Sequence, residues 1–195
     1  MKNILLATAL VFAGTAAIAA DFDNNGVNLV LERDNLTFGI DTVAGEATEL
    51  SVGVAVLPHT VVGADADLTF GAAYNIQNED FTLSAEYGLS KKFNQLNVYG
   101  SAEAAYTIAA GANNGGWEAT PTVGAAYQVN DKLTAFTEVS YTWDASDDWT
   151  QVGGEVEAGA RYAINDDIAF TPSVTRSFDT GADETNLNLE VGLRF

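Results

Sequence analysis

The 195-residue sequence contains no cysteine and only one histidine, His59. Without cysteine there can be no disulfide, no Cys-ligated metal and no lipid-anchoring cysteine. A transition-metal site usually needs several His or Cys ligands, so none is expected. The sequence therefore predicts neither a metal nor any other cofactor.

Long hydrophobic runs are also missing after the first twenty residues. None approaches the roughly 18 apolar residues that a transmembrane helix requires. Only helices and closed barrels satisfy every backbone hydrogen bond inside lipid. If residues 21–195 enter a membrane, they must do so as a closed β-barrel.

Basic residues are scarce: 8 Lys and Arg stand against 27 Asp and Glu, which gives a net charge of −19. A field of this sign repels nucleic acid, so no nucleic-acid partner is expected. The acids could cover a soluble exterior, or they could line a barrel lumen and attract cations. Charge alone does not choose between these two interpretations.

The N-terminus has the layout of a secretory signal peptide. Lys2 precedes an apolar stretch from Ile4 to Phe12, and Ala17-Ile18-Ala19 forms an A-x-A pattern before the polar residues that start at Asp21. A membrane anchor is the alternative, but Gly14 and Thr15 interrupt a run that is already short. We predict a signal peptide at residues 1–20 and one domain at residues 21–195.

Apolar residues alternate with polar ones at a period of two along most of this domain, which is typical of β-strands with one apolar face. From Val62 to Ile76 every second residue is apolar, and similar ladders continue to the C-terminus. The pattern predicts an all-β fold, an antiparallel up-and-down transmembrane β-barrel of about 10 strands, with 8 or 12 as alternatives.

The strand count depends on one position near Arg33 and Asp34, where the apolar residues change from odd to even numbers. A β-bulge there keeps one long strand and gives about ten strands. A tight turn would give about eleven, which single-chain bacterial barrels avoid. We therefore expect a bulge.

Turns and prolines complete the predicted strand plan. Short polar turns are expected after Tyr87, Tyr127 and Tyr162 and at residues 57–60, with longer links at the opposite rim. Pro121 and Pro172 fall inside predicted strands and are expected at bulges or strand ends, because proline cannot donate to a ladder.

Two features favour a barrel whose apolar face points outward into lipid. The apolar face is rich in alanine and glycine, which fill a soluble core poorly but suit a wall against lipid. Aromatic residues gather near both ends of the strands, including Trp117, Tyr141 and Trp143 near the longer links. Two such girdles are typical of the two membrane interfaces.

The last strand ends the sequence with Leu187, Leu189, Val191, Leu193 and Phe195 alternating against polar residues and glycine. A C-terminal strand of this kind, ending in phenylalanine, resembles that of small porin-like outer-membrane β-barrels of Gram-negative bacteria. The resemblance implies location in the cell outer membrane and contact with its lipid and lipopolysaccharide. It also implies that Phe195 serves as an assembly signal read by the outer-membrane assembly machinery.

The polar face is the candidate functional surface, because in this barrel it lines the lumen. Its acidic candidates are Asp65, Asp67, Glu86, Glu103, Glu118, Glu138, Glu155, Glu157 and Glu190, and its basic candidates are Lys132, Arg161 and Arg194. An excess of lumenal acids favours cations over anions. The sequence thus predicts a narrow cation-preferring pore or a structural envelope protein.

Three other interpretations remain open. In a barrel of this size side chains can fill the lumen, so that the acids pair with Arg161 and Arg194 in a plug. The barrel could instead display loops for surface binding or adhesion. A soluble acidic periplasmic barrel would turn the apolar ladder inward and bind an apolar ligand.

Catalysis is not expected. His59 falls in a predicted short turn, away from the rim that a triad would require. The pairs Asp65–Asp67 and Glu155–Glu157 share a strand face, but many acids line that face and nothing distinguishes a catalytic pair. The acidic loops at 144–148 and 179–184 do not match an EF-hand.

Overall fold

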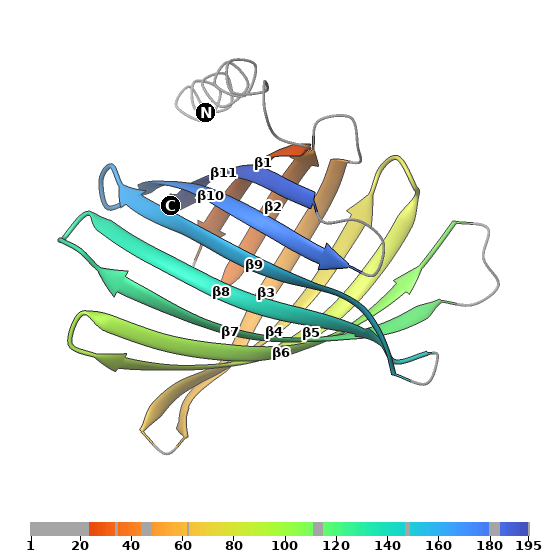
Figure 1. Ribbon diagram of the computed structural model, residues 1–195, viewed down its shortest axis with the longest axis horizontal. Coiled ribbons are helices and arrows are strands. Elements are labelled where there is room, and N and C mark those ends of the chain that lie inside the picture. Colours follow the sequence, from red (N-terminus) through yellow and green to blue (C-terminus); the bar gives the residue numbers. More distant parts are fainter. Residues whose placement is uncertain are drawn as a thin grey trace.

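The protein folds as a single closed β-barrel of eleven strands in a computed structural model (Figure 1). The structure describes residues 24–33, 35–43, 48–61, 63–110, 115–146, 149–179 and 184–194. The strands are β1 (Asn24–Arg33), β2 (Leu36–Val43), β3 (Thr48–Val61), β4 (Ala64–Asn75), β5 (Asp80–Phe93), β6 (Leu96–Ile108), β7 (Gly116–Gln128), β8 (Leu133–Asp144), β9 (Thr150–Ala163), β10 (Ile168–Asp179) and β11 (Glu184–Arg194).

Each strand pairs antiparallel with the next one along the chain, and the barrel closes through a parallel pair, β1 with β11. The closing pair is in register from Asn24 opposite Asn186 to Glu32 opposite Arg194. Because β1 and β11 run in the same direction, the start of β1 and the end of β11 lie at opposite rims.

The predicted transmembrane β-barrel is confirmed, but the strand count is eleven where ten was preferred. The difference lies at the parity change near Arg33. Here β1 ends at Arg33 and β2 begins at Leu36, with two residues between them and Arg33 opposite Leu36. A two-residue hairpin reverses the chain and keeps the apolar side of both strands on the same face.

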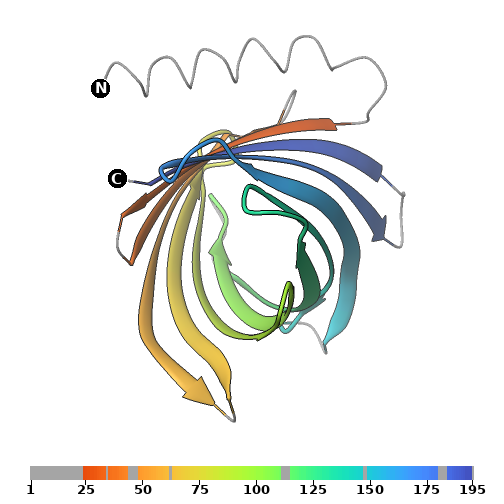
Figure 2. The same cartoon turned by 90° about the vertical axis from the view of Figure 1, so that its left-hand side faces the viewer.

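The apolar ladder faces outward. Large apolar side chains on the ladder positions are exposed, for example Val123 (67%), Phe70 (51%) and Leu83 (48%). Residues at the intervening positions of β1, β2 and β6 to β11 line a common internal cavity. Figure 2 shows the sheet curving around this interior. The alternative of an apolar interior is therefore wrong for this chain.

The two rims differ in the length of their connections, as predicted. At one rim β1–β2, β3–β4 and β5–β6 are joined by two residues and β7–β8 and β9–β10 by four. At the other rim the connections contain four, four, seven, five and four residues. We call these the short-turn rim and the long-loop rim.

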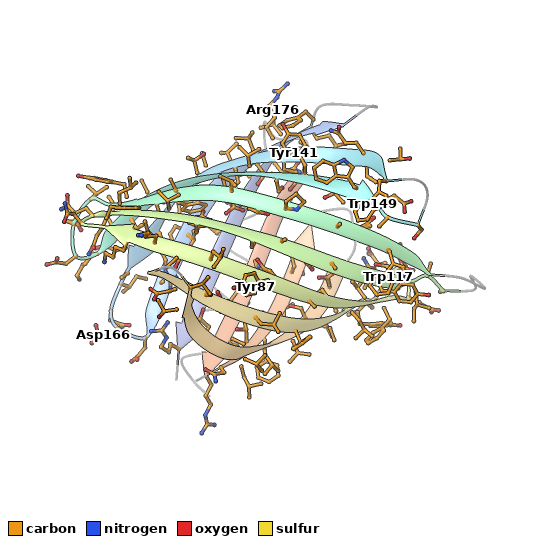
Figure 3. The ribbon with its side chains drawn as sticks, turned by 90° about the horizontal axis from the view of Figure 1, so that it is seen from below. Tyr87, Trp117, Tyr141, Trp149, Asp166 and Arg176 are labelled. Atoms are coloured by element: carbon orange, nitrogen blue, oxygen red, sulfur yellow. The ribbon has the colours of Figure 1, made fainter. Side chains whose placement is uncertain are left out.

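Two of the predicted turns are wrong. Residues 57–60 lie inside β3, which continues to Val61 with a register shift between Val56 and His59. Strand β5 continues past Tyr87 to Phe93, so Tyr87 lies well inside the strand and not at its end (Figure 3). In both segments the strand ladder continues through residues whose types are common in turns.

The strand prolines do not mark bulges. Pro121 lies opposite Ala102 and Pro172 opposite Leu189, with an unshifted register on either side of each proline. The second register shift occurs instead between Thr142 and Trp143. Each proline keeps one strand neighbour through a full ladder and has a gap in the ladder to the other, which accommodates its missing N–H.

An aromatic cluster marks the long-loop rim. The ring centroids of Tyr106 and Trp117 are 4.9 Å apart, and Tyr141 lies 6.0 Å from Trp143 and 5.8 Å from Phe178. These rings come from four strands, β6, β7, β8 and β10. The first contact joins the neighbouring strands β6 and β7, and the contact of Tyr141 with Phe178 passes over β9. Aromatic residues gathered in this way form a girdle of the type found at membrane interfaces.

The parallel seam can be tested because the chain has no cysteine of its own. Leu29 and Val191 are register partners across β1 and β11. Neighbouring strands lie about 4.8 Å apart, within the span of a disulfide. We expect Leu29→Cys with Val191→Cys to oxidise in the folded barrel and to shift the unfolded protein on a non-reducing gel.

The matched control is Leu29→Cys with Leu187→Cys, four residues further along β11, where the separation is about 13 Å. This pair should stay reduced. Equal oxidation of both pairs, or of neither, would show that β1 does not close the barrel in this register.

The lumenal cavity as candidate functional site

The interior of the barrel contains a cavity of about 550 Å³. It is lined by Gly26, Asn28, Asp41, Tyr99, Ala126, Thr134, Phe136, Glu138, Glu157, Arg161, Thr171, Ser173, Asn188 and Glu190. These residues come from β1, β2 and β6 to β11, and all occupy the polar positions of the alternation. The lining therefore belongs to the lumenal face of the strands, and it includes Phe136 and Ala126 among its polar residues.

Three of the predicted lumenal acids, Glu138, Glu157 and Glu190, line this cavity together with Asp41. Asp41 was not among the sequence candidates, although the even-numbered apolar ladder of β2 places it on the polar face. Arg161 is the one basic residue in the lining. The cavity thus has four carboxylates and one guanidinium.

The remaining predicted acids lie on the same face of their strands. Glu86 lies on β5 and Glu103 on β6, while Asp65 and Asp67 lie on β4 opposite Ser90 and Gly88. A Cβ added to Gly88 would fall 2.7 Å from Oδ1 of Asp67, so this carboxylate leans across β5.

Towards the long-loop rim, Glu118 faces Asp144, and Glu155 accepts a hydrogen bond of 3.0 Å from the Ser177 hydroxyl. The Ser177 residue belongs to β10 and Glu155 to β9, so this bond joins neighbouring strands on the polar face.

Carboxylates repeatedly face each other across neighbouring strands. The directly opposed pairs are Asp41–Glu49, Glu86–Glu103, Glu118–Asp144 and Glu138–Glu157. Like charges in this position destabilise a sheet. Hydration and counter-cations reduce that cost, and a lumen supplies space for both.

One polar row crosses the parallel seam. Across the register, Glu190 of β11 faces Asn28 of β1, Asn28 faces Asp41 of β2, and Asp41 faces Glu49 of β3. The Thr171 hydroxyl donates to Glu190 at 3.5 Å. The row places three carboxylates on four adjacent strands and extends the acidic surface beyond the cavity lining.

The basic candidates have three different settings. Arg161 lines the cavity, and no carboxylate of the described strands lies within ion-pair distance of it. Arg194 pairs with Glu32 at 3.1 Å across the β1–β11 seam. Lys132 differs from the prediction: it lies in the turn before β8, where its ammonium donates to the Ile164 carbonyl at 3.4 Å.

Two aromatic residues narrow the lumen by lying across glycines. Tyr99 of β6 reaches over β7 and donates a 2.9 Å hydrogen bond to Glu138 of β8. Gly124 lies between them and is opposite both residues in register; a Cβ there would overlap the Tyr99 ring. The missing side chain is therefore what allows the tyrosine to cross.

Phe136 of β8 has the same relation to Gly159 of β9, where a Cβ would fall 2.7 Å from the phenyl ring. The sequence analysis missed both aromatic residues. Aromatic residues on the polar face, each opposite a glycine of the next strand, are the pattern that could have identified them.

The described part of the chain contains no cluster of three or more His, Cys, Asp or Glu residues that could hold a metal ion. It also contains no helix long and apolar enough to cross a membrane. Phe195, residues 1–20 and the centres of both acidic loops lie outside the described residues, as does the side chain of His59.

A closed sheet with an apolar exterior, a polar lumen and aromatic girdles defines the class of transmembrane β-barrels. A family model described as the outer membrane protein beta-barrel domain matches residues 4–195. The chain therefore belongs to this family of outer-membrane proteins. No curated protein matches the sequence.

Solved outer-membrane barrels share the fold. The NanC porin superposes with a TM-score of 0.59 at 10% identity, over 86% of this chain and 91% of that one. A loop L8 deletion mutant of OmpT, an outer membrane protein of Vibrio cholerae, gives 0.50 at 14% identity over 81% of this chain. This chain spans only 58% of that OmpT structure.

The crossing of Tyr99 over Gly124 predicts a difference between two lumenal glycines. Gly124→Ala should destabilise the barrel by about 1–3 kcal/mol, because the new methyl group displaces the tyrosine from Glu138. Gly192→Ala is the control, since a Cβ there meets nothing within 4 Å. Urea unfolding in lipid vesicles measures both.

In a protein that already carries Tyr99→Ala, Gly124→Ala should no longer lower the free energy of unfolding, because the two side chains then no longer compete for the same space. Equal stability of the two single glycine variants would show that the tyrosine does not occupy this position.

Proposed function

We propose that the barrel forms a narrow, cation-preferring aqueous pathway across the outer membrane. The observation that carries the proposal is the charge of the cavity lining, four carboxylates against one arginine. Rings of acidic side chains favour cations in pores, and a low-dielectric wall strengthens their field.

The opposed carboxylate pairs support the same function. Glu138 and Glu157 face each other where both line the cavity. Two such groups are stabilised when a cation shares the space between them, and hydrated cations can do so without a fixed coordination geometry. This arrangement attracts cations along the lumen and holds none of them tightly.

The width of the lumen supports passage of small solutes only. Barrels of about eight strands are filled by side chains, whereas those of about sixteen leave a wide channel. Eleven strands, with Tyr99 and Phe136 projecting inward, give an intermediate interior. NanC is described as a porin, and what it shares with this chain is the barrel architecture.

The proposal is tested by conductance of the refolded protein in planar bilayers under a KCl gradient. The reversal potential should indicate cation preference. Glu138→Gln with Glu157→Gln should lower the cation-to-anion permeability ratio by about fivefold, as loss of about 1 kcal/mol of attraction would give.

Asp131→Asn is the control, because Asp131 is exposed in the turn between β7 and β8. It should leave the permeability ratio unchanged. If the folded protein gave no measurable conductance, the proposed pore function would be wrong and a structural role in the envelope would remain.

Arg161 allows a test of opposite sign. Arg161→Gln removes the one basic residue of the cavity lining. The permeability ratio should therefore rise, and it should fall again when Glu190→Gln is added. An unchanged ratio for Arg161→Gln alone would mean that the cavity does not lie on the ion pathway.

A further inference from the structure

The outer surface of the barrel carries a second hollow, distinct from the lumen. It is a shallow apolar groove of about 530 Å³ over β4 to β7 (Figure 3 shows Tyr87, at its edge). Its outward-facing residues are Ala64, Tyr87, Leu89, Lys91, Val98, Gly100, Ala102, Pro121 and Val123. We call it the β6 groove.

The groove exists because small residues of β6 lie between larger residues of its neighbours. In register, Gly100 is flanked by Leu89 and Val123, and Ala102 by Tyr87 and Pro121. The backbone of β6 forms the floor, and the flanking side chains form the two walls. A groove of this shape and polarity complements a flexible hydrocarbon chain.

Lys91 lies at the end of the groove nearest the short-turn rim, two residues before β5 ends. Its side chain belongs to the outward face, since its register partner Val98 is exposed there. The ammonium lies 3.8 Å from the position that a Cβ on Gly63 would occupy and 5.8 Å from the centroid of the Phe93 ring. No carboxylate of the described strands forms an ion pair with it.

We propose that the β6 groove binds one glycerophospholipid, with an acyl chain along Gly100 and Ala102 and the phosphate accepting hydrogen bonds from Lys91. In outer-membrane barrels short turns face the periplasm, so the lipid belongs to the periplasmic leaflet. At this interface the ammonium meets headgroups, and a charge-assisted bond to phosphate satisfies it.

Charge argues against a second copy of the chain as the occupant. A symmetric pair in a membrane places both copies at the same depth, so two Lys91 ammonium groups would meet at the edge of one apolar contact without a counter-charge. A phospholipid supplies both the hydrocarbon and the anion. The inference rests on membrane location alone and does not depend on conduction.

The test is native mass spectrometry of refolded full-length protein in detergent, titrated with phosphatidylglycerol or with phosphatidylcholine of the same chain length. One phosphatidylglycerol should remain bound in preference to phosphatidylcholine. Lys91→Gln should weaken phosphatidylglycerol binding by about tenfold and abolish the preference. Ala102→Leu, which fills the groove, should weaken binding of both lipids.

Lys92→Gln is the matched control, because it removes the same charge from the next residue, whose side chain belongs to the opposite face of β5. It should bind lipid as the parent protein does. Heat-modifiable gel mobility verifies that each variant is folded.

Equal phosphatidylglycerol binding by the Lys91 and Lys92 variants would overturn the proposal, as would unchanged binding by Ala102→Leu. A dimer that Ala102→Leu dissociates would also overturn it, because a second copy would then cover the groove. Bilayer conductance of the Lys91 and Ala102 variants, whose changed side chains face lipid, is expected to remain unchanged, which separates this result from the test of the pore.

Discussion

The constraint on which the whole structure depends is that no backbone N–H or C=O can remain unpaired in the hydrocarbon interior. A sheet satisfies this constraint only by closing into a barrel. The strand pair that closes it must therefore have a ladder as continuous as the other pairs. Here that pair is β1 with β11, parallel and in register over its length, with Arg194 bound to Glu32 at one end. An odd number of strands is compatible with closure because a parallel ladder satisfies the backbone too, at slightly lower stability per residue. The cost appears in the side chains near the seam, where Oδ1 of Asn28 and of Asn186 are buried without a hydrogen-bond partner among the described residues.

Closure also explains why this protein has almost no hydrophobic core. Only Ala66, Ala169 and Val191 are buried apolar residues in the described ranges. The apolar residues face lipid, and the interior is polar and partly empty. Some lumenal side chains cross between strands. Tyr99 spans three strands because Gly124 leaves room for its ring, and its hydroxyl binds one member of an opposed carboxylate pair. The acidic lining is tolerable because hydrated carboxylates cost less free energy than buried, dehydrated ones.

The alternation in the sequence was sufficient to predict the strands and the polar face on which the acids lie. The outward direction of the apolar face needed further signals, the small residues on that face, the aromatic residues near strand ends and the C-terminal strand. It was not sufficient for the strand count, because a change of parity is produced equally by a bulge and by a two-residue hairpin, as at Arg33. Turn composition misled at residues 57–60 and near Tyr87, since residue types that favour turns also occur inside strands. Which acids oppose each other depends on register between strands, which one sequence does not reveal. Lys132 was misplaced because the start of β8 sets its position, and strand ends carry the weakest pattern. Asp41 was missed although the apolar ladder of β2 places it on the polar face.

Strand β6 shows how one strand determines two surfaces. Along it, Tyr99 and Ser101 face the lumen, and Gly100 and Ala102 face lipid. Bulk on the inside narrows the cavity, and its absence on the outside leaves the groove. A β-sheet is a single layer of backbone. The β6 backbone that forms the floor of the groove therefore also carries Tyr99, whose hydroxyl reaches Glu138 on the other side. A side chain that fills the groove at Ala102 acts only on the lipid side, whereas a change at Tyr99 acts on the lumen and on the packing across Gly124. The two surfaces can therefore be altered independently, although a single alternation of large and small residues produced both.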